Sequence, residues 1–337
     1  MLTILVDVPV HASSLARLRA FPDVEVRLVP NPQEIRRPLP PELIGDVEVL
    51  MCTFPPENLG DMRKLRWVPI TSAGYSQLFN LGLVERGIRA ANGRGNFDVP
   101  IGEWNLAMMI NLTRNLRQMI RNQEAGVWDR SAQFQGEVRG LTVGIWGYGG
   151  IGRETARLAK ALGMIVHVMS RQGVRPAADI YRVPGTGDPE GILPDRVFVA
   201  GQELEFLSAL DFLILAMPLT PVTQGLIGDR ELGALPRHAF VLNPARGSLI
   251  QEQALLRALR EKVIAGAALD THYYYPTPPE HPLWKMPNVI FTPHISGSSL
   301  SPHFLARIWA ILEQKVQRFL AGQPLLNELT ADQLLGR

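Results

Sequence analysis

A glycine-rich stretch near the middle of the chain has the residue types and spacing of a phosphate-binding turn. The pattern GxGxxG occurs at Gly147, Gly149 and Gly152. On its own the pattern is weak support, because turns use glycine wherever the backbone needs a positive φ. Here an apolar segment precedes the turn, a helix-like pattern follows it, and a second apolar segment ends at Ser170. In that setting the N–H groups that begin the helix are expected to bind a pyrophosphate. The predicted dinucleotide contacts are Gly147, Tyr148, Gly149, Gly150, Ile151 and Gly152.

The end of the second apolar segment indicates which dinucleotide is preferred. NAD sites usually have an acidic residue at this point, where its carboxylate hydrogen-bonds the adenosine ribose. This chain has Ser170 followed by Arg171 instead. A hydroxyl and a guanidinium suit a 2′-phosphate, which a carboxylate would repel. The two residues therefore predict a preference for NADP(H), with NAD(H) possible; the alternative is that Arg171 is only a solvated loop residue.

Apolar segments of strand length recur along the chain, and helix-like periodicity follows them. They read TILVDV, VEVLMCTF, LRWVPITS, TVGIWG, IVHVMS, DFLILAM, AFVLN and IAGAALD. Continuous rather than alternating apolarity is typical of parallel strands that helices cover on both faces. The chain is therefore predicted to be α/β, with a doubly wound sheet.

Two further helices and one loop are predicted from local signals. Residues 101–120 show helical spacing of apolar residues, and we expect a domain crossover there. Near the end, Ser301 and Pro302 have the types of an N-cap and a first helical residue, and Gly322 is a stop signal. The segment 172–200 contains several Gly and Pro residues and little periodicity, so it is expected to be an irregular loop.

Length and composition bound the kinds of protein this chain can be. Its 337 residues, 46% of them hydrophobic, can bury a full core and favour two domains. A net charge of +2 with dispersed basic residues predicts no nucleic-acid partner and no membrane surface, and no apolar run reaches spanning length. Cys52 is the only cysteine, which excludes a disulfide within the chain and favours a reducing compartment, the cytoplasm. The first residues read as a strand rather than a signal peptide, and no metal site is predicted.

Six motifs occur in order along nearly the whole chain. They are TSAGY at 71–75, the glycine-rich turn, MPLTPVTQGLI at 217–227, LNPARGSLIQEQAL at 242–255, GAALD at 266–270 and HPLWKMPNVIFTPHISG at 281–297. With these motifs the chain resembles the D-isomer-specific 2-hydroxyacid dehydrogenase family, in particular glyoxylate/hydroxypyruvate reductases. The resemblance implies two Rossmann-like domains: a flavodoxin-like substrate domain and a doubly wound, parallel-sheet dinucleotide-binding domain. The substrate (catalytic) domain would comprise residues 1–101 and 300–337, and the dinucleotide-binding domain residues 102–299.

Two residues would carry the chemistry that the resemblance implies. Arg246 in NPARG matches the arginine that binds the substrate carboxylate and polarises the keto oxygen, and its planar, permanently charged guanidinium suits both tasks. His294 in TPHISG matches the general acid/base, and its ordinary pKa of about 6.5 suits proton transfer near neutral pH. The loop that binds the substrate carboxylate through N–H groups matches Ser72, Ala73, Gly74 and Tyr75. Further cofactor contacts match Pro218, Thr223, Ala245, Asp270, Ser296 and Gly297.

The family pattern is broken at one catalytic position. A glutamate that hydrogen-bonds the catalytic histidine is expected five residues after Asp270, directly before a proline. Here that position is Tyr275, followed by Pro276. A neutral tyrosine cannot raise the pKa of a histidine as a carboxylate does, so the pKa of His294 is expected to lie below the family's usual range. The Tyr275 hydroxyl could still accept an N–H from the histidine ring; alternatively, the tyrosines at 273–275 only pack between the domains.

The resulting hypothesis is an NADPH-preferring reductase that converts a small 2-keto acid to its D-2-hydroxy acid. Two alternatives remain open. A chain resembling the formate dehydrogenases of the same family, whose residue at the glutamate position is also non-acidic, would oxidise a small anion. A chain resembling the family's transcriptional corepressors would bind the dinucleotide without turnover. By analogy with the family, a homodimer through the cofactor domain is expected, with the long helix from Glu103 as one possible interface.

Overall fold

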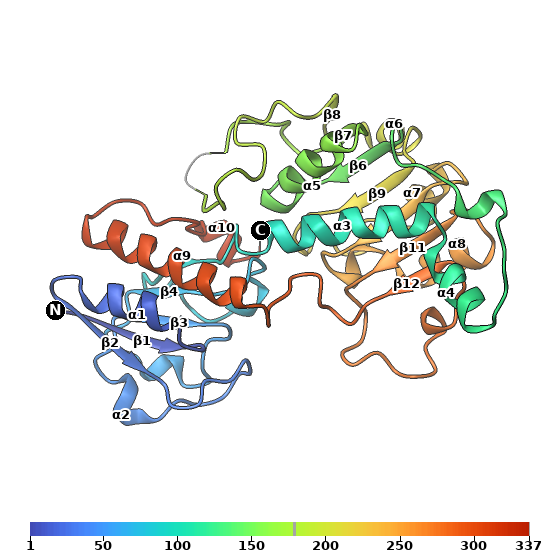
Figure 1. Cartoon of the computed structure of the whole chain (residues 1–337). Coiled ribbons are helices and arrows are strands. Elements are labelled where there is room, and N and C mark those ends of the chain that lie inside the picture. Colours follow the sequence, from blue (N-terminus) through green and yellow to red (C-terminus); the bar gives the residue numbers. More distant parts are fainter. Residues whose placement is uncertain (178–179, 337) are drawn as a thin grey trace. The chain divides into compact units, whose positions relative to one another are not determined.

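Parallel strands form the frame of the molecule, as the continuous apolar segments predict (Figure 1). The structure is a computed structural model that describes residues 1–177 and 180–336. It divides into unit 1, with residues 1–97, 180–183 and 299–336, and unit 2, with residues 98–177 and 184–298. The predicted domain boundaries follow residues 101 and 299, so each lies within a few residues of a change of unit. Residues 178 and 179 of the predicted loop and residue 337 of the predicted substrate domain lie outside the described residues.

Unit 1 is built on a five-stranded parallel sheet with the strand order β2-β1-β3-β4-β5. This order is that of flavodoxin-like folds, so the predicted flavodoxin-like domain is confirmed. The strands are β1 Leu2–Asp7, β2 Val24–Leu28, β3 Val49–Cys52, β4 Trp67–Pro69 and β5 Arg89–Ala91. The helical elements are α1 Ala12–Arg19, α2 Pro41–Ile44, η1 Leu59–Asp61, η2 Ser76–Leu78, α9 Pro302–Leu320 and α10 Ala331–Leu334.

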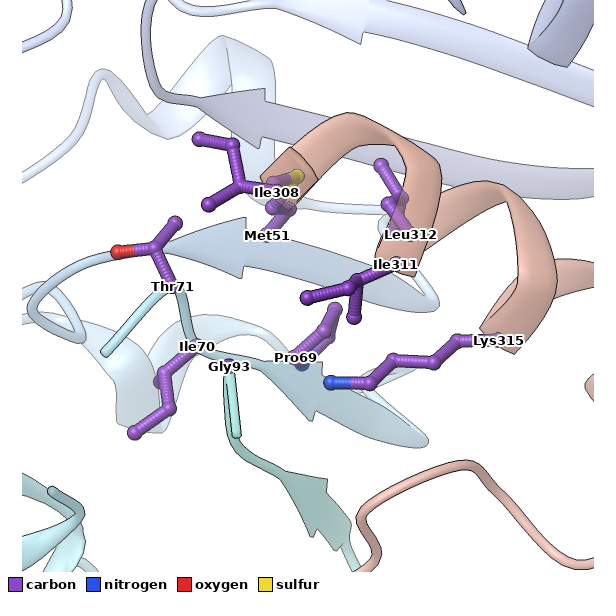
Figure 2. A pocket seen from close by; sticks show the side chains of 9 residues that line it. All are labelled: Met51, Pro69, Ile70, Thr71, Gly93, Ile308, Ile311, Leu312 and Lys315. Carbon is purple, nitrogen blue, oxygen red and sulfur yellow. The ribbon is translucent and has the colours of Figure 1, made fainter. Parts of the chain in front are cut away.

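Helix α9 packs on one face of the unit 1 sheet and has the ends that the sequence predicts. The Ser301 hydroxyl accepts a hydrogen bond from the Phe304 N–H at 3.3 Å, which makes Ser301 the N-cap. Gly322 follows the helix with φ +66°, a conformation that glycine adopts without strain. Figure 2 shows Ile308 of α9 beside Met51 of β3, and both belong to one buried cluster with β1 and α1.

Unit 2 is built on a seven-stranded parallel sheet with the order β12-β11-β10-β9-β6-β7-β8. Counted from β6, this is the order 3-2-1-4-5-6 of dinucleotide-binding Rossmann folds with one added strand, so the predicted doubly wound sheet is confirmed. The strands are β6 Thr142–Trp146, β7 Ile165–Met169, β8 Arg196–Phe198, β9 Phe212–Leu215, β10 Phe240–Asn243, β11 Gly266–Leu269 and β12 Val289–Phe291. The helical elements are α3 Asp98–Thr113, α4 Leu116–Glu124, η3 Ala132–Phe134, α5 Gly150–Ala161, α6 Glu203–Leu207, α7 Asp229–Ala234, η4 Gly247–Leu249, α8 Glu252–Arg260 and η5 Pro282–Trp284.

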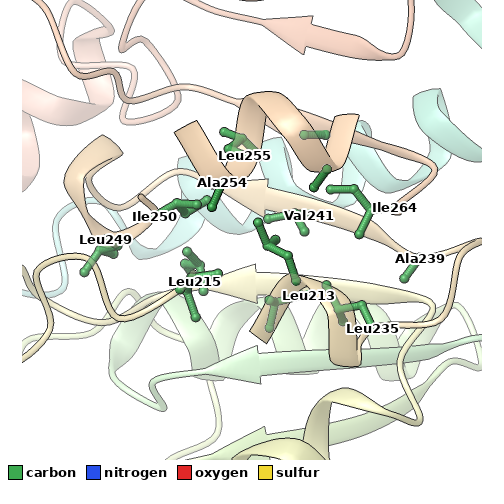
Figure 3. Close-up of a cluster of buried hydrophobic side chains, with 14 of the residues drawn as sticks. Leu213, Leu215, Leu235, Ala239, Val241, Leu249, Ile250, Ala254, Leu255 and Ile264 are labelled. Carbon is green, nitrogen blue, oxygen red and sulfur yellow. The ribbon is translucent and has the colours of Figure 1, made fainter. Parts of the chain in front are cut away.

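Both faces of the unit 2 sheet are buried. Successive residues of β9 alternate between two core clusters, with Phe212 and Ile214 on one side and Leu213 and Leu215 on the other. Figure 3 shows the second cluster, in which Leu213 and Leu215 pack with Val241 of β10 and with apolar side chains of α8. Because each face of the sheet has its own cluster, nearly every position of these strands must be apolar.

The helix predicted over residues 101–120 is in fact two helices. α3 starts at Asp98, before the predicted start, and stops short of Asn115. Asn115 has φ +46°, a left-handed conformation that interrupts a helix and that asparagine adopts more readily than most residues. In α4, Arg117 donates hydrogen bonds to three main-chain carbonyls, those of Trp284, Met286 and Val289. A contact with a segment distant in sequence therefore helps to hold α4 in its own direction.

Candidate active site

Three residues with charged or titratable side chains follow neighbouring strands of the unit 2 sheet. Arg246 follows β10, Asp270 directly follows β11, and His294 follows β12. Because these strands are parallel and adjacent, their carboxyl ends lie at one edge of the sheet. The charges of Arg246 and Asp270 both act on the His294 imidazole. The sheet thus brings together residues that are separated in the sequence.

The Asp270 carboxylate is buried and organises the turn that carries His294. Its oxygens accept hydrogen bonds from the hydroxyls of Thr292 and Ser296, at 2.6 and 2.5 Å, and from the N–H groups of Ile295 and Ser296, both at 2.9 Å. Hydrogen bonds to a carboxylate are among the stronger ones in proteins. His294 itself has φ +56°, a conformation that persists only where the surroundings enforce it. Asp270 therefore positions His294, a role that the sequence did not suggest, while its contact with the nicotinamide stays a prediction.

The side chain of His294 is exposed at this edge and lies beside the ring of Tyr275. The two ring centroids are 5.5 Å apart and the ring planes are tilted by 58°. The pKa of His294 is lowered from its ordinary value, mainly because the surrounding protein displaces water from the imidazolium and also because Arg246 is charged. Asp270 opposes this lowering. The surroundings of His294 therefore favour its neutral form.

The hydroxyl of Tyr275 accepts a hydrogen bond from the main-chain N–H of His272 at 3.2 Å. It does not take up the bond to the His294 ring that the sequence left open, and only the ring of Tyr275 contacts the imidazole. Burial raises the pKa of Tyr275, so the phenol stays neutral near pH 7. Tyr275 thus borders the histidine without supplying a negative charge.

The Arg246 guanidinium is half-buried and charged. Its Nη1 donates to the carbonyl of Ala245 at 2.7 Å, and among the described residues no carboxylate forms an ion pair with it. Burial lowers the pKa of Arg246, but arginine starts so high that it keeps its charge. A charged fork without a carboxylate partner in the protein is suited to bind the carboxylate of a substrate.

Three supporting residues were not predicted. Asn243 lies at the end of β10, and its side-chain oxygen accepts hydrogen bonds from the N–H groups of Ala245 and Arg246. Its side-chain nitrogen donates to the Arg246 carbonyl at 2.8 Å. His272 is buried, and its ring lies 2.7 Å from the Thr292 carbonyl and stacks on Phe291. Gly247 must lack a side chain, because a Cβ at this position would come within 2.4 Å of the His272 main chain. Asn243 and Gly247 lie inside the motif LNPARG, which is the only sequence signal for them.

The glycine-rich turn lies between β6 and α5, where the order of the strands reverses, because β7 is on one side of β6 and β9 on the other. Such a reversal is where open α/β sheets bind ligands. Gly147 has φ +105°, and a Cβ there would come within 2.7 Å of the Ala216 main chain. At the start of α5, the N–H groups of Gly150, Ile151 and Gly152 precede the first hydrogen bond within the helix. This cradle of N–H groups and close-packed glycine fits the pyrophosphate of a dinucleotide.

The side chain of Tyr148, predicted among the cofactor contacts, is buried within unit 2. Its hydroxyl donates to the carboxylate of Asp188 at 2.6 Å. The same carboxylate accepts three N–H groups at 3.1 Å, those of Gly191, Ile192 and Leu193. The segment predicted as an irregular loop is therefore tied to the glycine-rich turn, and only the main chain of Tyr148 is left to face a cofactor.

The remaining predicted cofactor residues lie on loops at the carboxyl ends of the strands. After β7, the Ser170 hydroxyl donates to the Gly173 carbonyl at 2.9 Å, and Arg171 is exposed. After β9, the Thr223 hydroxyl donates to the Pro218 carbonyl at 2.8 Å and closes that loop. Ala245 directly precedes Arg246, and Gly297 lies three residues after His294.

The loop predicted to bind the substrate carboxylate lies in unit 1 and follows β4. The Ser72 hydroxyl donates to the Gly74 carbonyl at 2.7 Å and accepts from Gln77 at 2.6 Å. Tyr75 is partly buried and meets Phe79 edge to face, with the ring centroids 5.9 Å apart. The side chains of Ser72 and Tyr75 thus contact the loop itself, and in the described part of the chain the N–H groups of Ala73 and Gly74 donate to no protein group.

Comparison with known proteins assigns the chain to a family. A family model described as "D-isomer specific 2-hydroxyacid dehydrogenase, NAD binding domain" matches residues 106–296. The chain belongs to the D-isomer specific 2-hydroxyacid dehydrogenase family. These enzymes are NAD(P)-dependent dehydrogenases, and the resemblance predicted from the motifs is confirmed.

Two relatives and one solved structure show the extent of the likeness. The D-3-phosphoglycerate dehydrogenase of Methanocaldococcus jannaschii is 30% identical over 329 residues, 96% of this chain but 58% of that protein, so the chain spans little more than half of its length. The glyoxylate reductase of Thermococcus gammatolerans is 31% identical over 286 residues, 82% of this chain and 81% of that enzyme. A family member from Aeromonas salmonicida has a TM-score of 0.80 at 27% identity, with 98% of this chain and 99% of that chain covered.

The cofactor class of a 2-hydroxyacid dehydrogenase fits the residues in unit 2. The matched segment contains the glycine-rich turn and the first N–H groups of α5, which suit a nicotinamide dinucleotide. Within residues 1–177 and 180–336, no group of three or more His, Cys, Asp or Glu side chains is arranged to hold a metal ion. In the same residues, no helix combines the length and apolarity needed to cross a membrane.

Proposed function

We propose that this dehydrogenase uses NAD(P)H to reduce a small 2-keto acid to its D-2-hydroxy acid. One observation carries the proposal: a charged arginine without a carboxylate partner follows β10, and a positioned histidine follows β12, on the other side of β11 in the sheet that holds the glycine-rich turn. The glyoxylate reductase among the relatives supports a small keto acid as the substrate class. We also propose residues 1–101 with 300–337 as the substrate domain and residues 102–299 as the cofactor domain.

In this mechanism the side chains bind the substrate and move one proton. The bound cofactor would supply a hydride to the keto carbon. Arg246 binds the substrate carboxylate and polarises the keto oxygen, whose developing negative charge it stabilises. The His294 imidazolium donates its proton to that oxygen, and Asp270 holds the histidine in place. The free N–H groups of the loop at 72–75 bind the substrate carboxylate as well.

The proposal is tested by following the oxidation of NADPH and NADH across about pH 5 to 9, with glyoxylate, hydroxypyruvate, pyruvate and phenylpyruvate as substrates. Turnover of one or more keto acids is expected. Oxidation of formate without keto-acid reduction would favour a formate-dehydrogenase-like enzyme, for which the non-acidic Tyr275 is the supporting observation. Binding of both cofactors without any turnover would favour a corepressor-like binding protein.

We propose that Ser170 and Arg171 give a preference for NADPH. The double substitution Ser170→Asp with Arg171→Ala should shift the ratio of kcat/KM toward NADH by roughly tenfold or more, because it removes a cation and adds a carboxylate where the 2′-phosphate would bind. Steady-state kinetics with both cofactors measures the shift. Arg130→Ala, at another exposed arginine of unit 2, is the matched control and should leave the ratio unchanged. An unaltered ratio in the double variant would refute the assignment.

The pH dependence of kcat/KM for reduction should reflect the absence of a glutamate beside His294. Reduction needs protonated His294, so the rate should fall as pH rises through the lowered pKa of this residue, below its ordinary value. Tyr275→Glu should raise that pKa, because a carboxylate favours the imidazolium, and activity should then extend to higher pH. The pH profiles of kcat/KM for the two proteins measure this. Tyr274→Glu, at the exposed neighbouring position, should not move the profile, and a shift of equal size there would contradict the assignment.

We further propose a cytoplasmic homodimer formed through unit 2. Exposed apolar side chains are concentrated in and after α3 and α4, where a second copy could cover them: Ile110, Leu116, Ile120, Val127 and Trp128. Such a concentration often marks an interaction surface. The single, buried Cys52 is compatible with a reducing compartment.

A further inference from the structure

Lys315 is a buried lysine in α9 of unit 1. Its side chain lines a small cavity whose other walls are mainly apolar, formed by Met51, Pro69, Ile70, Thr71, Gly93, Ile308, Ile311 and Leu312 (Figure 2). Burial lowers the pKa of Lys315 to about 7. A lone ammonium is costly to bury, and an apolar side chain of similar volume would usually avoid that cost. The position of Lys315 therefore calls for an explanation other than stability.

The Lys315 ammonium holds one peptide of the chain, that of Asn92. Its Nζ donates to the Asn92 carbonyl at 2.6 Å. Asn327 donates to the same carbonyl at 3.3 Å and to the Arg94 carbonyl at 2.8 Å, and the Asn92 N–H donates to the Asn327 carbonyl at 3.2 Å. The main chain at Asn92 is thus anchored to α9 and to the segment that follows it.

Asn92 and Gly93 in turn hold the proposed substrate loop. The Asn92 side chain donates to the Ala73 carbonyl at 2.7 Å, and the Gly93 N–H donates to the Ser72 carbonyl at 2.8 Å. A Cβ on Gly93 would lie 1.9 Å from the Thr71 carbonyl, so the two segments meet backbone to backbone. Any movement of the Asn92 peptide would therefore be passed on to this loop.

These bonds decide where the free N–H groups of the loop point. In a trans peptide, a carbonyl and the N–H of the next residue point in opposite directions. Because the Ser72 and Ala73 carbonyls are directed at Asn92 and Gly93, the N–H groups of Ala73 and Gly74 are directed away from them. Within the described part of the chain, these two N–H groups donate to no protein group. They are available to an anion.

We propose that Lys315 is a positioning residue for substrate binding, because its bond to the Asn92 carbonyl fixes the peptides that present the Ala73 and Gly74 N–H groups to the substrate carboxylate. The inference rests on the proposed function for the identity of the ligand. The link from Lys315 to the loop rests on the hydrogen bonds alone.

The test uses the full-length enzyme and Lys315→Met, which keeps an unbranched chain of similar length but cannot donate. We expect KM for glyoxylate to rise roughly tenfold, as for the loss of a charged hydrogen bond, with a smaller change in kcat and an unchanged Kd for NADPH. We also expect faster hydrogen–deuterium exchange of the amides at 71–75 in the substrate-free enzyme. The thermal midpoint of Lys315→Met should be equal to or higher than that of the wild type.

Ile311→Val is the matched control, since Ile311 lines the same cavity and takes no part in these hydrogen bonds. It should lower the thermal midpoint slightly without changing KM or the exchange of the loop. If Lys315→Met leaves both KM and exchange unchanged, or if Ile311→Val reproduces its effects, the proposal is overturned. Should Lys315→Met fail to fold, Asn92→Ala, which removes the side-chain bond to Ala73, must still raise KM and loop exchange. If the wild type turns over no keto acid, the proposed function fails, whereas the exchange measurement still decides the role of Lys315.

Discussion

Replacing His294 with glutamine should lower kcat for keto-acid reduction by about 100- to 10,000-fold, the usual contribution of a general acid. Glutamine keeps a hydrogen-bond donor of similar size but has no proton to transfer. The four bonds from Asp270 to the surrounding turn do not involve the His294 side chain, so the turn should keep its conformation. KM and the Kd for NADPH should therefore change much less than kcat. Steady-state kinetics with NADPH titrations by fluorescence would measure all three quantities.

The matched control for this variant is His303→Gln, at an exposed histidine in α9. It should leave kcat within about twofold of the wild type, since a surface histidine outside the site transfers no proton. The pH profile adds an independent readout. In His294→Gln the remaining rate should lose the dependence on an ionisation below about pH 6.5 that is expected of the wild type. A variant that keeps most of its kcat would show that another group, or water, donates the proton.

Arg246→Met should lower kcat/KM for the keto acid by about 100- to 1,000-fold, the usual cost of removing one donor that stabilises charge in the transition state. The variant should lose both substrate binding and polarisation of the keto oxygen, so kcat and KM should change together. Asn243, which shapes the turn through main-chain bonds, does not contact the guanidinium, and the turn should survive the substitution. Arg246→Lys keeps the charge but loses the planar fork, and an intermediate loss is expected.

Arg237→Met, at an exposed arginine of unit 2, is the control for a general loss of positive charge. It should leave kcat/KM essentially unchanged, and NADPH binding should be the same in all three variants. Equal losses in Arg246→Lys and Arg246→Met would mean that the fork geometry matters and the charge alone does not. Undiminished kcat/KM in Arg246→Met would remove this residue from the site, and with it the main support for the proposed function.

Most of the fold was predictable because its strands are marked by local signals, apolar segments that recur along the whole sequence. The apolar segments that predict strands include those of β1, β3, β4, β6, β7, β9, β10 and β11. The strands β2, β5, β8 and β12 were missed. β2 has only one fully buried position, β5 and β12 have three residues each, and β8 lies within the segment expected to be irregular. Short or partly exposed strands carry too little apolar pattern to be recognised.

The break between α3 and α4 shows a different limit. The apolar residues of 101–120 continue with helical spacing through Asn115, so periodicity predicts one helix. Asparagine is a moderately poor helix former rather than a certain stop. The left-handed conformation of Asn115 and the three carbonyls bound by Arg117 separate the helices, and those carbonyls belong to a segment more than 150 residues away.

The sequence by itself determined the fold class, the glycine-rich turn, the family and the identity of Arg246 and His294 as candidates, because each depends on residue types at short spacing. Tertiary structure alone decided which group each polar atom meets. In the folded chain, the Tyr275 hydroxyl accepts a hydrogen bond from the His272 main chain, and the Tyr148 hydroxyl donates to Asp188. The Asp270 carboxylate accepts four hydrogen bonds. Hydrogen bonds require donor–acceptor distances that are correct to within a few tenths of an ångström, and suitable angles. Spacing along the chain specifies neither. The bond from Lys315 to Asn92, 223 residues apart, is of the same kind.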